Sequence, residues 1–189
     1  MRHTAAKVLH VLALGLWFGG AGFFNFVTAP TIFDTFKEVV AAGPSDRTAH
    51  QTISPPGTDP ATQAALANAL AGAAVGPVFP KYFAMQAGCA LVAGATALGW
   101  WNGGGTVHRR RVVVIGLAAL TVAVAWPVST YVSELRVQRF DPSDEVRTAA
   151  KALFGPWHLV SLGLSFVTVG LAGVALAMAT RLPPEEERG

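Results

Sequence analysis

The sequence predicts an all-α membrane protein, a four-transmembrane-helix bundle with a short interfacial helix in each of the two outer connections. Charged residues make up only 13% of the 189-residue chain and the mean hydropathy is +0.44, which is too little charge to cover a soluble domain. Four apolar runs contain no Asp, Glu, Lys or Arg, and each has the roughly 20 residues that cross a bilayer. Backbone groups in hydrocarbon must be hydrogen-bonded internally, so these runs are expected to be helices.

The four predicted spans cover residues 8–33, 82–101, 112–133 and 152–180. The first resembles a secretory signal because Arg2 and Lys7 precede it, but its 26 uncharged residues exceed the usual apolar region of about 7–15. We therefore expect it to be retained as a helix. The spans predict a single domain over residues 1–181, followed by a disordered acidic tail at 182–189.

Two longer connections are predicted on one side of the membrane. Residues 34–81 begin as a polar loop rich in proline and glycine, and then become alanine-rich at 61–75, which predicts an interfacial helix. In the connection between spans three and four, Asp141 and Pro142 have the residue types of an N-cap and a first helical position, so a second short helix is expected there.

Basic residues predict the orientation. Each side of the four-span map carries seven Lys and Arg residues, but Arg109, Arg110 and Arg111 lie in a very short loop, where the positive-inside bias is strongest. This predicts both termini in the cytoplasm and a multi-pass protein of the plasma (inner) membrane. The lipid bilayer is then the main partner. Nucleic acid is not expected as a partner, because the basic residues form no patch.

Small residues recur at helical spacing and predict close helix packing. The same faces offer a surface to a second copy or to another membrane protein. The pairs are Gly15 with Gly19, Ala84 with Gly88, and Gly170 with Gly173.

No catalytic constellation is found, so the chain is not expected to be an enzyme. Within the spans the ionisable residues are His10 and His158, and such residues are functional candidates by default. The four-span map separates them by roughly 20–25 Å along the membrane normal, from about 1.5 Å rise per residue, so they cannot share one metal ion. His10 alone is kept as a metal-ligand candidate; no cofactor is predicted, while haem or copper stays open.

Polar residues and prolines gather at the level of His158 in the predicted bundle. They suggest a small ligand-binding vestibule beneath the outer connections, and the alternative is ordinary interfacial polarity. The candidate ligand-binding residues are Asn25, Pro30, Pro80, Tyr82, His158 and Ser161.

Several motifs, in this order and at these spacings, resemble the bacterial four-helix membrane family related to transmembrane protein 205. They are His10 with Trp17–Phe18–Gly19–Gly20, Ala29–Pro30–Thr31–Ile32–Phe33, Val78–Phe79–Pro80–Lys81–Tyr82–Phe83, and Phe154–Gly155–Pro156–Trp157–His158–Leu159–Val160–Ser161. The chain departs from the family at Ser165, where an asparagine is frequent. The resemblance implies export or trafficking, without a defined reaction.

The opening helix also resembles that of copper-resistance D-type proteins and of four-helix haem-dependent protoporphyrinogen oxidases, which implies a haem or metal role for His10. Three hypotheses follow. The first is binding or tolerance of a small molecule or metal at the vestibule, the second a structural or assembly subunit of a membrane complex, and the third a haem- or copper-binding redox protein.

Overall fold

A computed structural model describes residues 2–41, 58–101 and 105–182, with side chains from Thr4 onward. Every regular element in these ranges is a helix, which confirms the all-α class. The described chain contains three helical stretches long and apolar enough to cross a membrane: Thr4–Ala41, Thr106–Gln138 and Asp144–Arg181.

The chain divides into two compact units, each described by itself. Unit 1 combines Met1–Gly22 with Pro80–Gly189, and unit 2 is Phe23–Phe79. The predicted tail lies outside the described residues except for Leu182.

Unit 2 contains a helix pair preceded by a π-helical turn. Helix α1 (Arg2–Phe23) leads into the π-helix η1 (Phe24–Thr28) and then into α2 (Ala29–Ala41). The Ala29 N–H donates to the Phe24 carbonyl, five residues back. A wide turn of this kind suits the proline at position 30, whose ring would clash with the carbonyl four residues earlier in a regular α-helix.

Residues 34–41 were predicted to be loop, and this was wrong, because they form most of α2. The Lys37 ammonium pairs with the Asp34 carboxylate one turn away at 2.9 Å, and Val40 is fully buried where α2 packs against α3 (Pro60–Val75). Tertiary burial of this last turn overrides its polar composition. Residues 42–57 of the predicted loop lie outside the described residues.

The alanine-rich helix predicted at 61–75 is confirmed as α3. Its N-cap is Asp59, whose carboxylate accepts hydrogen bonds from the N–H groups of Ala61 and Thr62 at 3.0 Å each. A hydrogen bond from the Thr62 side chain is the largest cause that lowers the pKa of the Asp59 carboxyl below its ordinary value, and the two backbone N–H groups lower this pKa further.

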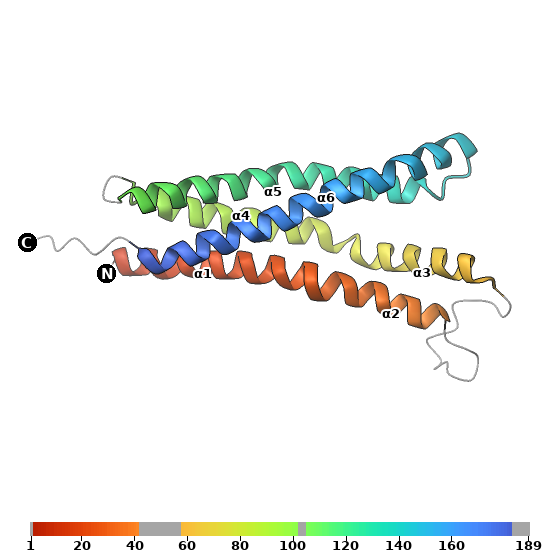
Figure 1. Cartoon of the computed structure of the whole chain (residues 1–189), viewed down its shortest axis with the longest axis horizontal. Coiled ribbons are helices and arrows are strands. Elements are labelled where there is room, and N and C mark those ends of the chain that lie inside the picture. The colour runs from red at the N-terminus through yellow and green to blue at the C-terminus, as the bar shows by residue number, and fades with distance from the viewer. Residues whose placement is uncertain (1, 42–57, 102–104, 183–189) are drawn as a thin grey trace, which may run out of the picture. The chain divides into compact units, whose positions relative to one another are not determined.

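Unit 1 is built from α1, α4 (Val78–Leu98), α5 (Thr106–Gln138) and α6 (Asp144–Met178), followed by the 3₁₀ turn η2 (Ala179–Arg181). Figure 1 shows the start of α1, the end of α6 and the junction of α4 with α5 at the same end of this unit. We call it the terminal end. The second predicted short helix is not a separate element, because its residues form the first turns of α6.

The predicted cap of that helix also needs correction. Ser143, not Asp141, is the N-cap residue, and helical residues begin at Asp144. The Asp141 carboxylate instead accepts the Ser143 N–H at 2.8 Å, a turn within the loop that keeps the carboxylate from capping the helix.

The glycines predicted to allow close helix approach differ in their surroundings. A Cβ at Gly173 of α6 would lie 3.0 Å from the Phe18 ring of α1, so a larger residue there would push the ring away by a few tenths of an ångström. A Cβ at Gly15, Gly19 or Gly170 would meet nothing within 4 Å. Those positions are not close contacts within the described chain.

Candidate functional site

Buried positions of α5 recur at steps of three or four residues, the pattern of one packed helix face. They are His108, Arg111, Ile115, Ala118, Val122, Ala125, Ser129, Val132 and Leu135. His108 and Arg111 therefore extend this mostly apolar face toward the terminal end of unit 1. Arg109 and Arg110 lie off this face and are exposed, whereas Arg111 is 0% exposed.

His108 joins α5 to the end of α4 and orients Arg111. Its Nε2 lies 2.9 Å from the Ala97 carbonyl oxygen, and its Nδ1 lies 2.7 Å from Arg111 Nη2. A carbonyl only accepts and a guanidinium only donates. His108 is thus the neutral tautomer with hydrogen on Nε2, and it accepts one N–H of Arg111.

His10 of α1 is also completely buried, and its Nδ1 is hydrogen-bonded to α4. Its Nδ1 lies 2.8 Å from the Thr96 hydroxyl oxygen, and that oxygen also lies 2.7 Å from the Val92 carbonyl and 3.0 Å from the Ala93 carbonyl. Thr96 has one hydroxyl hydrogen, which goes either to one of these carbonyls or to His10 Nδ1.

The indole of Trp100 connects the two histidines. Its centroid lies 5.3 Å from the His10 ring and 6.2 Å from the His108 ring, both edge-to-face. Arg111 lies within electrostatic range of His10. We call the group of His10, Thr96, Trp100, His108 and Arg111 the His–Arg cluster; all five belong to unit 1.

Three nitrogen atoms of this cluster are buried without a hydrogen-bond partner in the described part of the chain: His10 Nε2, Arg111 Nε and Arg111 Nη1. Neither of the two ion pairs found among the described residues involves Arg111. The cluster thus contains a buried positive charge and unused N–H donors on Arg111, together with one unpartnered ring nitrogen of His10.

The residues of the predicted vestibule fall into both units. Asn25 and Pro30 belong to unit 2, while Pro80, Tyr82, His158 and Ser161 belong to unit 1. Within unit 1 the Tyr82 hydroxyl lies 3.5 Å from the Ser165 hydroxyl, at the position where the chain departs from the family pattern. His158 is exposed and stacks on Phe154 at 5.4 Å. The vestibule stays a prediction.

The cluster does not fit a copper ion well. His10 offers one ring nitrogen without a partner in the described chain, but the described residues contain no group of three or more His, Cys, Asp or Glu that could hold a metal ion. A cation at Nε2 would also be repelled by the Arg111 charge. A haem is a large macrocycle and would need a wide opening beside His10, whereas His10 has no exposed surface.

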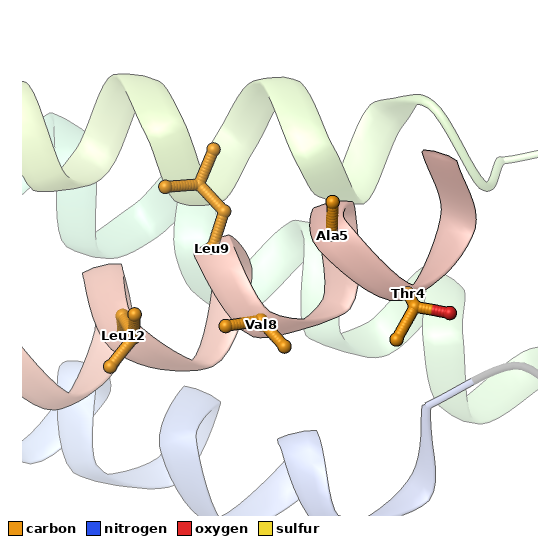
Figure 2. Close-up of a pocket in the computed structure, with 5 residues that line it drawn as sticks. All are labelled: Thr4, Ala5, Val8, Leu9 and Leu12. Carbon is orange, nitrogen blue, oxygen red and sulfur yellow. The ribbon is translucent and has the colours of Figure 1, made fainter. Parts of the chain in front are cut away.

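A separate groove of about 710 Å³ follows the outer face of α1 and is lined by Thr4, Ala5, Val8, Leu9 and Leu12. Figure 2 shows these five side chains on α1 alone. The three larger ones are each more than half exposed. Such an apolar surface suits contact with acyl chains and brings no chemical group to the cluster.

Sequence reasoning identified His10 but missed His108 and Arg111. The arginine triplet was interpreted only as a signal for the orientation of the spans. The signal that would have found them is the spacing of the α5 face, since counting back from Ile115 by four and then three residues reaches Arg111 and His108.

Comparisons with protein-family models, curated proteins and solved structures gave no match in any of the three. The resemblance to the family related to transmembrane protein 205 therefore stays a prediction.

Proposed function

We propose that the chain is a four-span protein of the plasma membrane that binds a small anion in the His–Arg cluster. The observation that carries this proposal is the complete burial of the Arg111 guanidinium, with Nε and Nη1 unpartnered in the described chain. Arginine stays protonated in proteins. A buried charge without a counter-charge costs several kcal/mol, and a bound anion would remove that cost.

The neutral histidines also favour an anion. His108 uses its acceptor on Arg111 and its donor on Ala97, so it directs the guanidinium without compensating its charge. A water molecule at Nε or Nη1 would satisfy hydrogen bonds but would leave the positive charge unbalanced. An anion satisfies both requirements.

The fourth span in this proposal is α4. It has 21 residues, long enough to cross hydrocarbon at about 1.5 Å per residue. Its buried polar residue Gln86 accepts a hydrogen bond from the Trp17 indole at 3.2 Å, and Lys81 lies exposed near its first turn, where an ammonium can reach the headgroups. The exposed Arg109 and Arg110 favour cytoplasmic termini.

Anion binding is tested by titrating the protein, purified in lipid nanodiscs, with sodium nitrate and following tryptophan emission. A bulky sulfonate salt holds the ionic strength constant. We expect a saturable change because Trp100 contacts both histidines. Arg111→Gln should abolish the change, and the matched control Arg110→Gln should keep it. Identical titrations of wild type and Arg111→Gln would reject the site.

The topology is tested by cysteine labelling of intact cells in a Cys89→Ala background. Position 109 is in the first turn of α5, beside the junction predicted to be cytoplasmic, and position 147 is in the first turn of α6, on the predicted outer side; the two variants are Arg109→Cys and Arg147→Cys. A membrane-impermeant maleimide should label only the second. Labelling of the first from outside would overturn the orientation.

A further inference from the structure

A second group of basic residues lies at the other end of unit 1, where α5 ends and α6 begins (Figure 1). We propose that it binds the phosphate headgroup of an anionic phospholipid. Arg136 and Arg139 come from the end of α5, and Phe154 and His158 come from α6; we call these four residues the distal basic cluster. The proposal is independent of the anion site in the His–Arg cluster.

The Phe154 ring joins the cations of α5 to α6. The guanidinium carbon of Arg139 lies 3.9 Å from the centre of this ring, within the roughly 6 Å over which an aromatic face attracts a cation. The His158 ring stacks on Phe154 at 5.4 Å, with 7° between the two planes. Arg136 is one turn before Arg139, on the same side of α5, and both arginines lie within electrostatic range of His158.

The positive charge of Arg139 has no counter-charge among the ion pairs found in the described chain. Those pairs join Lys37 to Asp34 and Arg147 to Asp144. The Arg139 Nε is buried without a hydrogen-bond partner in the same part of the chain. Contact with an aromatic ring holds a guanidinium in place and leaves its full charge. An anionic ligand is therefore the partner that this arrangement selects.

The position of the cluster along α6 favours a lipid over a dissolved anion. Phe154 is the third residue of the uncharged run 152–180, and His158 lies further inside it, so the cluster lies where headgroups meet hydrocarbon. Exposed apolar residues recur at helical spacing around it, each more than a third exposed: Leu153, Trp157 and Val160. A phospholipid can place its phosphate at Arg139 and its acyl chains along this surface, whereas a phosphate ion would have to leave water.

The charge of the cluster also selects among phospholipids. Phosphatidylglycerol and phosphatidylcholine both present phosphate oxygens, but the trimethylammonium group of phosphatidylcholine is repelled by Arg136 and Arg139. Each basic residue near a membrane surface strengthens the binding of anionic lipid about fivefold. The exposed His158 ring can add an N–H donor to a further phosphate oxygen. Phosphatidylglycerol is thus the expected ligand of the two.

The test is native mass spectrometry of the full chain in detergent, titrated with dioleoyl phosphatidylglycerol or dioleoyl phosphatidylcholine, which have the same acyl chains. Wild type should bind the first phosphatidylglycerol about tenfold tighter than phosphatidylcholine, and Arg139→Gln should lower this preference about fivefold. The matched control is Arg147→Gln, which removes the same charge at the same end from a guanidinium already paired with Asp144. It should keep the preference within about twofold.

A second variant keeps the test decisive if Arg139→Gln does not fold. Phe154→Leu leaves every charge in place and removes the ring that holds Arg139, so it should lower the preference about threefold. Equal preferences in wild type, Arg139→Gln and Phe154→Leu would overturn the site. So would equal losses in Arg139→Gln and Arg147→Gln, which would assign the binding to general surface charge. Displacement of the lipid by soluble glycerol phosphate would overturn the assignment to a lipid.

Discussion

Arg111→Gln is expected to stabilise the anion-free protein even though it removes the proposed site. A charge left buried without a partner is destabilising by about 3–5 kcal/mol, and within the described residues the Arg111 guanidinium has no counter-charge. Glutamine at this position can still donate to His108 Nδ1, which now accepts from Arg111 at 2.7 Å, because residues three apart lie on the same helix face. The shorter amide makes a poorer bond, so the net gain in the free energy of unfolding should be about 1–3 kcal/mol.

The assay is reversible unfolding in mixed micelles with an increasing fraction of sodium dodecyl sulfate, with and without the ligand anion. Wild type should gain about 2.7 kcal/mol at an anion concentration 100 times Kd, and Arg111→Gln should gain nothing. Arg110→Gln, on the exposed neighbour, should stay within about 0.5 kcal/mol of wild type in both conditions. If Arg111→Gln destabilised the anion-free protein by more than 1 kcal/mol, the guanidinium would already be compensated by the protein and our reasoning would be refuted.

Two further predictions concern packing and pH. Gly173→Ala should leave the protein about 1–3 kcal/mol less stable than Gly170→Ala in the same micelle assay, because only the methyl group at 173 would meet the Phe18 ring, at 3.0 Å. The gain in helix propensity is common to both variants and cancels in the comparison. Equal stabilities of the two variants would contradict the close approach of α6 to Phe18. Asp59 has a depressed pKa, so its cap stabilises α3 above the unfolded pKa of the carboxyl, and this stability is lost as pH falls through the folded pKa. Amide hydrogen exchange at the start of α3 should thus show extra opening at acidic pH, corrected for the intrinsic rate, and none in Asp59→Asn; the same acid response in both proteins would assign it to another group.

The sequence was sufficient to predict the helical class because its low charge and long apolar runs indicate a bilayer as the surroundings of the chain. In a bilayer, backbone groups must be hydrogen-bonded internally, which favours helices. It was less reliable at helix ends. Residues 34–41 are polar enough to be assigned to a loop, but they are helical in α2, which contains the buried Val40 and packs against α3. That contact depends on a segment some 20 residues away in the chain, which local composition does not report.

The His–Arg cluster illustrates a different limit. Charge alone assigns all three consecutive arginines to the surface, and this holds for Arg109 and Arg110. Arg111 differs only in its phase on α5, which places it beside His108 on the packed face. The partners that complete the cluster, His10 and Thr96, come from α1 and α4, so no single stretch of sequence contains the site.

The position of Arg111 at the start of α5 has a consequence for biogenesis. During insertion the translocation machinery encounters three adjacent basic residues before the apolar stretch, and all three contribute to retaining the junction on the cytoplasmic side under the proposed orientation. Only after the helices assemble is the third withdrawn from water. Arg111 thus acts first as a topological signal and later as part of the folded interior, while Arg109 and Arg110 remain to preserve the orientation when it is substituted.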